Sequence, residues 1–234
     1  MRAILKRELS AYFTSPVGYV YLAAFWFFAG YFLFTGVLVN NSTSLTPVFE
    51  VLVTIVMILT PLLTMRLMSE DRRNRTDQAL LTAPVSLGAI VAGKFLAAAA
   101  VYAAGISITL AFAAVLSAFG PVHWALVWGN YVALLLLGLA FVSIGVFISS
   151  LTENQVVAAV GSFAAMLALF LLDALPSLIS RPWLTAFVNG VSFTKRYVPI
   201  TNGILAPANL FFFASVAAAF LFLTTRTLEK RRWS

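Results

Sequence analysis

The side chains that could do chemistry are concentrated in one polar stretch, residues 66–84, which lies between two long apolar runs. The stretch reads R-L-M-S-E-D-R-R-N-R-T-D-Q-A-L-L-T-A-P and carries seven charged side chains. A chain this apolar gains nothing from such a stretch unless the stretch meets a hydrated and charged surface. We therefore predict that residues 66–84 form a docking surface.

Within this stretch, residues 76–82 are predicted to form a short helix parallel to the membrane. Thr76 can serve as the N-cap, and Asp77 lies in the first turn, where a negative charge favours the helix dipole. Pro84 ends the helix, because proline disfavours helix in the residue before it. The helix carries two apolar side chains and lies next to four charged ones, which are Leu80, Leu81, Glu70, Asp71, Arg72 and Arg73. The alternative is an ordinary solvated loop of the same composition.

The elements that must position this surface are membrane helices. The chain is 62% hydrophobic and only 10% charged, which lies outside the range of soluble domains. A spanning helix needs about 20 apolar residues, and six runs qualify: residues 17–39, 48–65, 87–119, 124–148, 156–175 and 208–225. They are too long, and alternate too little, for the strands of a membrane barrel. The prediction is a single-domain, all-α integral membrane protein with six transmembrane helices.

The distribution of the basic residues predicts the orientation. With both termini inside, only Arg181, Lys195 and Arg196 lie on the outer side. The cytoplasmic side then holds the other basic residues: Arg2, Lys6, Arg7, Arg66, Arg72, Arg73, Arg75, Lys94, Arg226, Lys230, Arg231 and Arg232. This is the positive-inside pattern, so the net charge of +7 reflects topology and attraction to the lipid bilayer rather than to nucleic acid.

Two segments outside the spans have their own patterns. Residues 1–15 are predicted to form an amphipathic interfacial helix, with an apolar face of Ile4, Leu5, Leu9, Tyr12 and Phe13, and the Ser15-Pro16 pair ends it. Residues 176–207, on the outer side, contain prolines that divide the segment into pieces too short to span. Short re-entrant or interfacial helices are predicted there, between spans five and six.

A second cytoplasmic contact point is predicted in the tight turn between spans four and five. The turn contains Thr152, Glu153, Asn154 and Gln155. The spacing of Thr152 and Gln155 matches a capping box, in which both side chains satisfy amides at the start of a helix.

The sequence contains few of the motifs that catalytic or metal sites require. Gly88, Gly93 and Lys94 have the spacing of a phosphate-binding loop, but Phe95 replaces the Ser or Thr that holds Mg²⁺. The chain has no cysteine and one histidine, so disulfides, thiol catalysis and the usual zinc sites are excluded. Lys94 is expected to extend its ammonium group toward the lipid headgroups.

Three further polar residues near the outer ends of spans leave alternatives open. Glu50 and Asp173 could form a proton or cation site, since carboxylates in membrane segments are functional candidates. An intramembrane enzyme would have to use Asp173 and His123. No nucleophile motif accompanies them, so we predict no catalytic site, no metal site and no cofactor in this chain.

The polar stretch also carries a resemblance. Residues 69–85 resemble the cytoplasmic signature of type-2 ABC transporter permeases, roughly E-x-x-x-x-G-T-x-x-x-L-L-x-x-P-V. The G-K-[FY] that follows in the family is matched by Gly93, Lys94 and Phe95. Residues 150–155 and 226–233 are similar to the gliding-motility-type subgroup. The chain departs from the pattern at Arg75, where the family usually has glycine, and at Ala206, where an acidic residue often stands.

The resemblance implies a permease subunit of an ABC exporter in the bacterial cytoplasmic membrane. Two permease chains, as a homodimer or heterodimer, would form the pathway. A separate ABC ATPase would bind ATP and Mg²⁺, and a periplasmic accessory subunit could join them. Residues 76–82 would be the coupling helix, with Glu70, Arg72 and Arg73 making charged contacts to the ATPase and Leu80 and Leu81 filling an apolar notch. The alternative function is a membrane scaffold in a secretion or gliding-motility complex.

Overall fold

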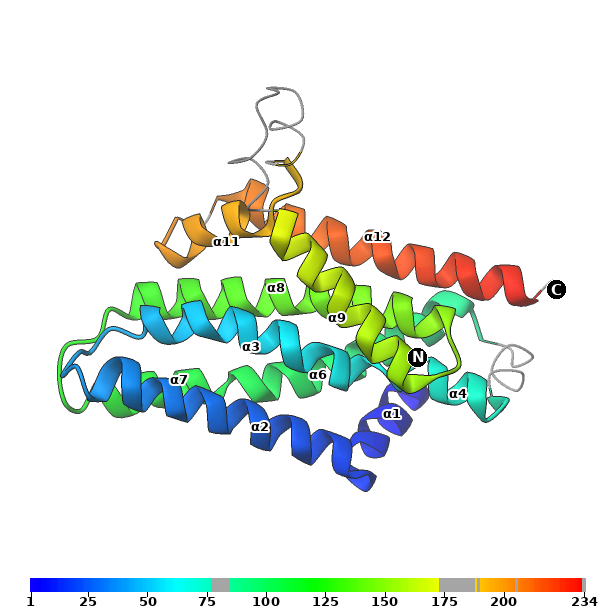
Figure 1. Ribbon diagram of the computed structural model, residues 1–234, viewed down its shortest axis with the longest axis horizontal. Coiled ribbons are helices and arrows are strands. Elements are labelled where there is room, and N and C mark those ends of the chain that lie inside the picture. The colour runs from blue at the N-terminus through cyan, green and yellow to red at the C-terminus, as the bar shows by residue number, and fades with distance from the viewer. Residues whose placement is uncertain (77–84, 173–187, 189, 205, 233–234) are drawn as a thin grey trace.

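The computed structural model describes residues 1–76, 85–172, 188, 190–204 and 206–232, and this part of the chain is helical, without a strand (Figure 1). Six of its helical segments are long and apolar enough to cross a membrane: Pro16–Leu38, Thr46–Arg73, Leu87–Leu116, Trp124–Leu151, Gln155–Leu172 and Pro207–Arg231. The prediction of an all-helical, multi-pass membrane protein is therefore confirmed.

The helices follow the apolar runs closely. In chain order they are α1 (Arg2–Thr14), α2 (Pro16–Leu33) with the π-helical turn η1 (Phe34–Leu38), α3 (Thr46–Thr64), α4 (Ser69–Arg73), α6 (Leu87–Ile106), α7 (Ile108–Leu116), α8 (Trp124–Leu151), α9 (Gln155–Leu172), α11 (Phe193–Thr201) and α12 (Pro207–Arg232). The third apolar run, expected as one helix, is divided at Ser107 into α6 and α7.

Helix α8 forms the centre of the bundle and packs against α3, α6, α9, α11 and α12. In the most apolar stretch of α8, 67% of the residues are buried inside the protein, whereas 22% are buried in the corresponding stretch of Pro16–Leu38. Two glycines of α8 explain the close packing, because small residues let membrane helices approach one another. A Cβ atom at Gly138 would lie 2.1 Å from the ring of Tyr102, and one at Gly145 would lie 2.2 Å from Oγ1 of Thr64.

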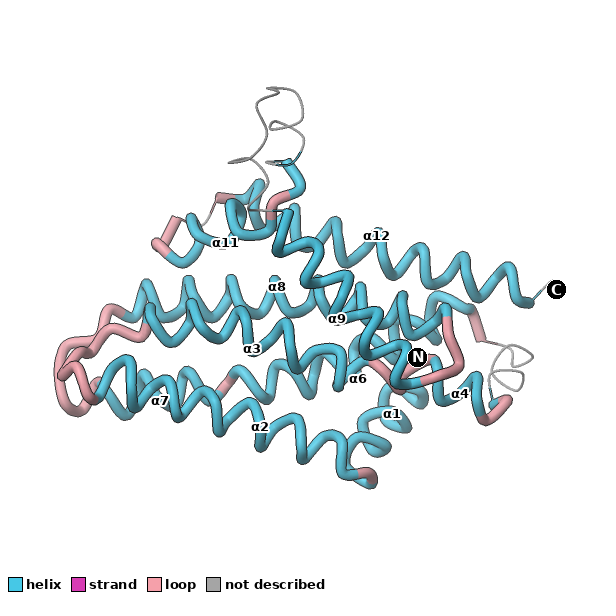
Figure 2. Tube along the Cα trace, viewed as in Figure 1, coloured by secondary structure: helices cyan, strands magenta, loops and turns pink. Residues whose placement is uncertain are grey.

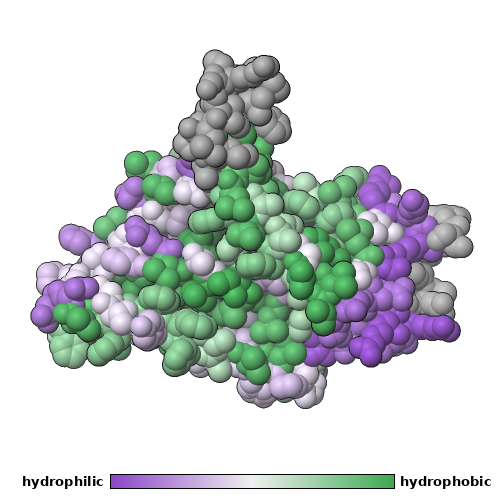
Figure 3. Space-filling model, in the orientation of Figure 1, coloured by the Kyte–Doolittle hydropathy of each residue, from purple (hydrophilic) through white to green (hydrophobic). Residues whose placement is uncertain are grey.

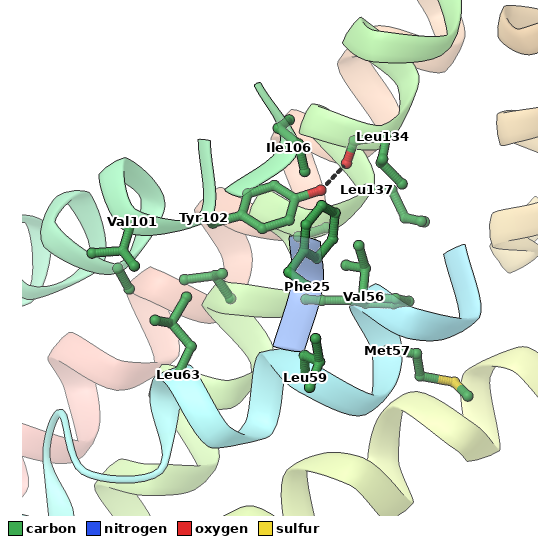
Figure 4. Packing of buried hydrophobic residues seen from close by; sticks show 14 of the residues in the cluster. Phe25, Val56, Met57, Leu59, Leu63, Val101, Tyr102, Ile106, Leu134 and Leu137 are labelled. Carbon is green, nitrogen blue, oxygen red and sulfur yellow. Dashed lines mark hydrogen bonds between the residues drawn. The ribbon is translucent and has the colours of Figure 1, made fainter. Parts of the chain in front are cut away.

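The core between α2, α3, α6 and α8 is built around a tyrosine (Figure 4). The side chain of Tyr102 is fully buried and points from α6 to α8. Its hydroxyl donates a hydrogen bond to the carbonyl oxygen of Leu134. Phe25 of α2 and Val56 of α3 close the space around the ring. A buried hydroxyl needs such a partner, because an unsatisfied polar group in an apolar core costs about 1–3 kcal/mol.

Several connections gather at the two ends of the bundle (Figure 2). One end holds the loops of residues 39–45 and 117–123. The other end holds α1, α4, the turn of residues 152–154 and the last turns of α12, and we call it the charged end. Hydrophobic residues cover the middle of the molecular surface, and hydrophilic residues cover the charged end (Figure 3).

The two segments predicted outside the spans are partly described. Helix α1 ends at Thr14 because Ser15 is extended (φ −102°, ψ 161°) and Pro16 begins α2, as the sequence predicts. The position of α1 at the membrane surface stays a prediction. Within residues 176–207, α11 is a short helix. Residues 173–187, which include Asp173, lie outside the described residues, and the re-entrant course of this segment also stays a prediction.

Candidate coupling surface

A buried lysine organises the charged end. Lys94 lies in the second turn of α6 and is only 1% exposed. Its Nζ donates hydrogen bonds to Oε1 of Glu8 at 3.0 Å and to the carbonyl oxygen of Leu67 at 2.5 Å, and it forms an ion pair with Oδ2 of Asp71 at 2.6 Å. One ammonium group therefore connects α1, α4 and α6. The expectation that Lys94 extends to the lipid headgroups is wrong, because these acceptors hold the ammonium inside the protein.

A second cation balances the charge of this cluster. The guanidinium of Arg7 pairs with Oε1 of Glu8 at 2.5 Å and lies 3.5 Å from Oδ2 of Asp71. Two cations thus face two carboxylates, and the cluster of Arg7, Glu8, Asp71 and Lys94 has no net formal charge. Neutrality matters because an uncompensated charge in a desolvated site is strongly destabilising. The cluster therefore fixes the position of α4 relative to α1 and α6.

Helix α1 is also attached to the end of α3. The Tyr12 hydroxyl donates a hydrogen bond to the carbonyl oxygen of Leu63 at 2.6 Å. Burial, and next the charge of Glu8, raise the pKa of Tyr12 above its ordinary value, so the hydroxyl keeps its proton. Arg66 donates from Nη1 to Oγ of Ser15 at 2.6 Å and from Nε to Oε2 of Glu70 at 2.7 Å. These bonds link α4 to the break between α1 and α2.

Helix α4 is bonded on its other side to the turn between α8 and α9. Arg72 forms an ion pair from Nε to Oε1 of Glu153 at 3.0 Å and donates from Nη1 to the carbonyl oxygen of Leu151 at 2.9 Å. Oγ of Ser149 accepts hydrogen bonds from the backbone N–H groups of Met68 and Ser69 at 3.1 and 3.2 Å. The two contact points predicted separately, at α4 and in the turn, are therefore joined to each other.

Of the predicted charged residues that the structure describes, three thus have partners within the chain, and Arg73 makes no ion pair with a described residue. Glu70 pairs with Arg66, Asp71 belongs to the buried cluster, and Arg72 holds Glu153. Among the described residues Arg73 is exposed and makes no ion pair. In the described part of this surface, residues 73–76 are exposed.

The remaining candidates are only partly described. Oγ1 of Thr76 donates a hydrogen bond to Oδ1 of Asp71 at 2.9 Å, which ties the start of the predicted coupling helix to α4. Four other predicted residues, Asp77, Leu80, Leu81 and Pro84, lie outside the described residues. Their roles stay predictions.

The predicted capping box in the α8–α9 turn is wrong. Oδ1 of Asn154, not the Thr152 hydroxyl, accepts from the amides of Val156 and Val157, at 2.9 and 3.4 Å. Oγ1 of Thr152 instead accepts from the amide of Asn154 at 3.2 Å. Asparagine is as good an N-cap as threonine, and because α9 begins at Gln155, Asn154 is the residue directly before the helix.

Arg75 occupies a backbone conformation that favours glycine, with a φ of +56°. The left-handed region costs a residue with a Cβ atom about 1–2 kcal/mol. We expect Arg75→Gly to stabilise the protein by about 0.5–1 kcal/mol, because it removes this strain while making the unfolded chain more flexible. The measurement is thermal unfolding in detergent, followed by tryptophan fluorescence.

The matched control for this prediction is Asn74→Gly. Asn74 has a φ of −86°, so glycine relieves no strain there and should lower the midpoint of unfolding. A rise in both variants would contradict the strain argument.

Sequence reasoning missed two residues of this surface. Glu8 lies four residues after Ile4 and four before Tyr12, so all three lie on the buried face of α1. A single carboxylate in an apolar helix face signals a buried partner, and this spacing could have identified it. Ser149 gives no such signal, because serine is common at the ends of membrane helices.

The bonds of this surface join α4 to its neighbours. Within the described ranges no group of three His, Cys, Asp or Glu side chains could hold a metal ion. The hydrogen bonds and ion pairs instead join α4 to α1, α3, α6 and the α8–α9 turn. A displacement of α4 would therefore move the ends of several membrane helices together.

Comparison with known proteins assigns the chain to a family. Residues 3–228 match the family described as ABC-2 family transporter protein, which is nearly the whole chain. No curated protein matches the sequence. Members of this family are membrane components of ABC transporter systems, work with an ATPase partner and are generally not catalytic themselves. With its six apolar helices, the chain is a multi-pass membrane protein that belongs to the ABC-2 transporter family.

Proposed function

We propose that the chain is the permease subunit of an ABC exporter and that the charged end is the cytoplasmic surface on which a separate ATPase docks. The observation that carries the proposal is the attachment of α4. It is bonded through Asp71 to Lys94 of α6, through Glu70 to Arg66, and through Arg72 to Glu153. A docking element that merely held a partner would not need bonds to so many membrane helices.

The proposed mechanism transmits work from the ATPase to the membrane. ATP and Mg²⁺ are bound by the partner, and closure of the partner moves α4 together with the ends of α3, α6 and α8. Nucleotide can shift the membrane helices only by as much as its binding differs between their two arrangements. A stiff connection between α4 and the membrane helices transmits most of this difference in binding free energy, because little of it is spent on deforming the contact. The exposed residues 73–76 make the contact, together with Leu80 and Leu81.

The rest of the assembly follows from the same proposal. Two permease chains, identical or similar, form the pathway in a bacterial cytoplasmic membrane, with both termini in the cytoplasm. Helix α1 lies at the membrane surface beside the ATPase. A periplasmic accessory subunit would contact the opposite end of the bundle. The family match does not favour the alternative of an immobile scaffold in a secretion or gliding-motility complex.

Replacing Leu80 and Leu81 together with aspartate should abolish retention of the ATPase and stimulated ATP hydrolysis. Two charges in an apolar notch would be desolvated without partners, which costs several kcal/mol. The measurement is co-purification with the ABC ATPase, followed by its turnover in proteoliposomes. Full retention and full stimulation in the double variant would exclude the proposed contact.

Cross-linking locates the same contact from the described residues. The chain has no cysteine, so single cysteines can be introduced without background. Asn74→Cys, at the exposed charged end, should cross-link to the ATPase and react with impermeant reagents only from the cytoplasm. The matched control is Asn41→Cys at the opposite end, where Asn41 is also exposed; it should react only from outside and give no ATPase adduct. Labelling of Asn74→Cys from outside would overturn the orientation and the function together.

A further inference from the structure

A pocket on the side of the bundle away from the charged end contains an unpaired carboxylate. The pocket has a volume of about 350 Å³ and lies between α3, α8, α9 and α11, and Glu50 of α3 lies in its wall. Glu50 is exposed, and it makes no ion pair or hydrogen bond with any residue that the structure describes. A carboxylate among apolar residues of a membrane protein is a candidate for binding a cation.

Arg196, a cation of the helix that borders the pocket, is already engaged elsewhere. The guanidinium of Arg196 donates to Oδ1 of Asn209 at 3.4 Å and lies over the ring of Phe212, 5.6 Å from its centre. The chain therefore supplies no cation to Glu50 in the part that the structure describes. The exposed carboxylate of Glu50 is therefore available to a cationic ligand.

The other walls of the pocket are aromatic and aliphatic. They include Phe141, Phe170, Phe193 and Tyr197, and the rings of Phe141 and Phe193 are stacked with centres 5.7 Å apart. Tyr197 and Glu50 line the same pocket, and burial, and next the charge of Glu50, raise the pKa of Tyr197. Aromatic faces attract organic cations, so a carboxylate beside aromatic rings is a favourable environment for an alkylated ammonium group.

Space for a hydrocarbon chain follows the same helix face. Leu137 and Phe141 of α8 line the pocket, and Ile144 and Ile148 line a second cavity of about 340 Å³. Leu169 of α9 borders both cavities. The four α8 residues recur at helical spacing, so they form one apolar stripe. The first cavity alone is within the usual size of ligand sites, about 300–1,000 Å³.

We propose that this pocket binds an amphipathic ammonium compound, with its ammonium group at Glu50 and its hydrocarbon chain along α8. Two sources share this chemistry: an ethanolamine lipid of the bilayer and a free long-chain amine. The inference does not depend on ATPase coupling, because the pocket lies away from the charged end and its occupancy can be measured in the isolated permease.

The test is equilibrium binding of radiolabelled dodecyltrimethylammonium to the purified chain in phosphatidylglycerol nanodiscs. We expect saturable binding that Glu50→Gln weakens about tenfold, equivalent to about 1.4 kcal/mol, because the carboxylate is lost while the shape is kept. Binding of dodecanol, which lacks the charge, should be equal in both proteins. Glu229→Gln is the matched control, since Glu229 pairs with Arg226 at the far end of α12, and it should bind the ammonium probe as the unaltered chain does.

Further arms separate the two sources and define failure. If phosphatidylethanolamine in the nanodisc displaces the probe, the pocket is a lipid site. If it does not, the pocket takes a free amine. Val53→Trp, which fills the pocket from α3, should remove saturable binding of both probes. The proposal is overturned by absence of saturable binding, by equal affinity for dodecyl sulfate, or by unchanged ammonium affinity in Glu50→Gln.

Discussion

Replacement of Lys94 with methionine should destabilise the protein by about 3–5 kcal/mol, the range found when one partner of a buried ion pair is removed. Methionine fills a similar volume, so the effect comes from charge rather than from a cavity. Glu8 and Asp71 would then face each other with Arg7 alone to compensate them, and the carbonyl oxygen of Leu67 would lose its donor. The midpoint of thermal unfolding in detergent should fall by about 10 °C.

Two further variants show whether charge balance is the cause. Lys230→Met removes an exposed lysine near the end of α12 and should leave the midpoint almost unchanged. Adding Asp71→Asn to Lys94→Met restores neutrality, since Arg7 and Glu8 remain as a pair, and should recover much of the lost stability. If Lys94→Met behaved like Lys230→Met, the buried cluster would not hold α1, α4 and α6 together.

A second large loss of stability is expected when a single methyl group is added to the core at Gly138. Gly138→Ala places a methyl group within 2.1 Å of the Tyr102 ring, which is far below any van der Waals contact. The ring cannot rotate away easily, because its hydroxyl is bonded to α8 itself. Overpacking typically costs about 1–3 kcal/mol, and the rigid surroundings place this substitution at the upper end. The measurement is again the midpoint of thermal unfolding.

The control for this substitution lies in another helix of the same bundle. A Cβ atom at Gly30 would meet nothing within 4 Å, so Gly30→Ala should be neutral or stabilising, as alanine is the better helix former. Tyr102→Leu should partly relieve Gly138→Ala, so the double variant is less destabilised than the sum of the two single ones. Simple additivity would mean that the α6–α8 contact is not the origin of the effect.

The positions of the membrane helices could be predicted because the bilayer imposes them. Each span must exceed about 20 apolar residues, and a helix of that length stands out in a sequence. The start of α6 carries a local signal as well, because Ser86 stands directly before the apolar run and its Oγ accepts a hydrogen bond from the amide of Ala89 at 3.4 Å. The division of the third apolar run at Ser107 could not be predicted, because one serine in an apolar run is tolerated inside membrane helices.

The interior of the charged end could not be predicted in the same way. Glu8, Asp71 and Lys94 come from segments far apart in the chain. Asp71 and Lys94 are each typical of an exposed polar residue near a membrane, and the spacing of Glu8 signals a buried partner without saying which residue it is. Only the packing of α1 against α6 brings them together and removes their water. The backbone conformation at position 75 could be predicted, because it is a local property. The family usually has glycine there, which indicates a left-handed conformation. Arg75 adopts this conformation although it is not glycine.

The double attachment of α4 limits how this permease could be retargeted to a different motor subunit. Exchanging Glu70, Asp71 or Arg72 to match a foreign ATPase would first break contacts inside the permease. In the proposed docking mode, recognition could be changed without breaking these contacts at residues 73–75, whose side chains are exposed, and at Leu80 and Leu81. Residues 70–72 must therefore be kept, because they hold the permease together. A change of ATPase partner, by engineering or after gene duplication, would have to exchange the contact residues and leave residues 70–72 unchanged.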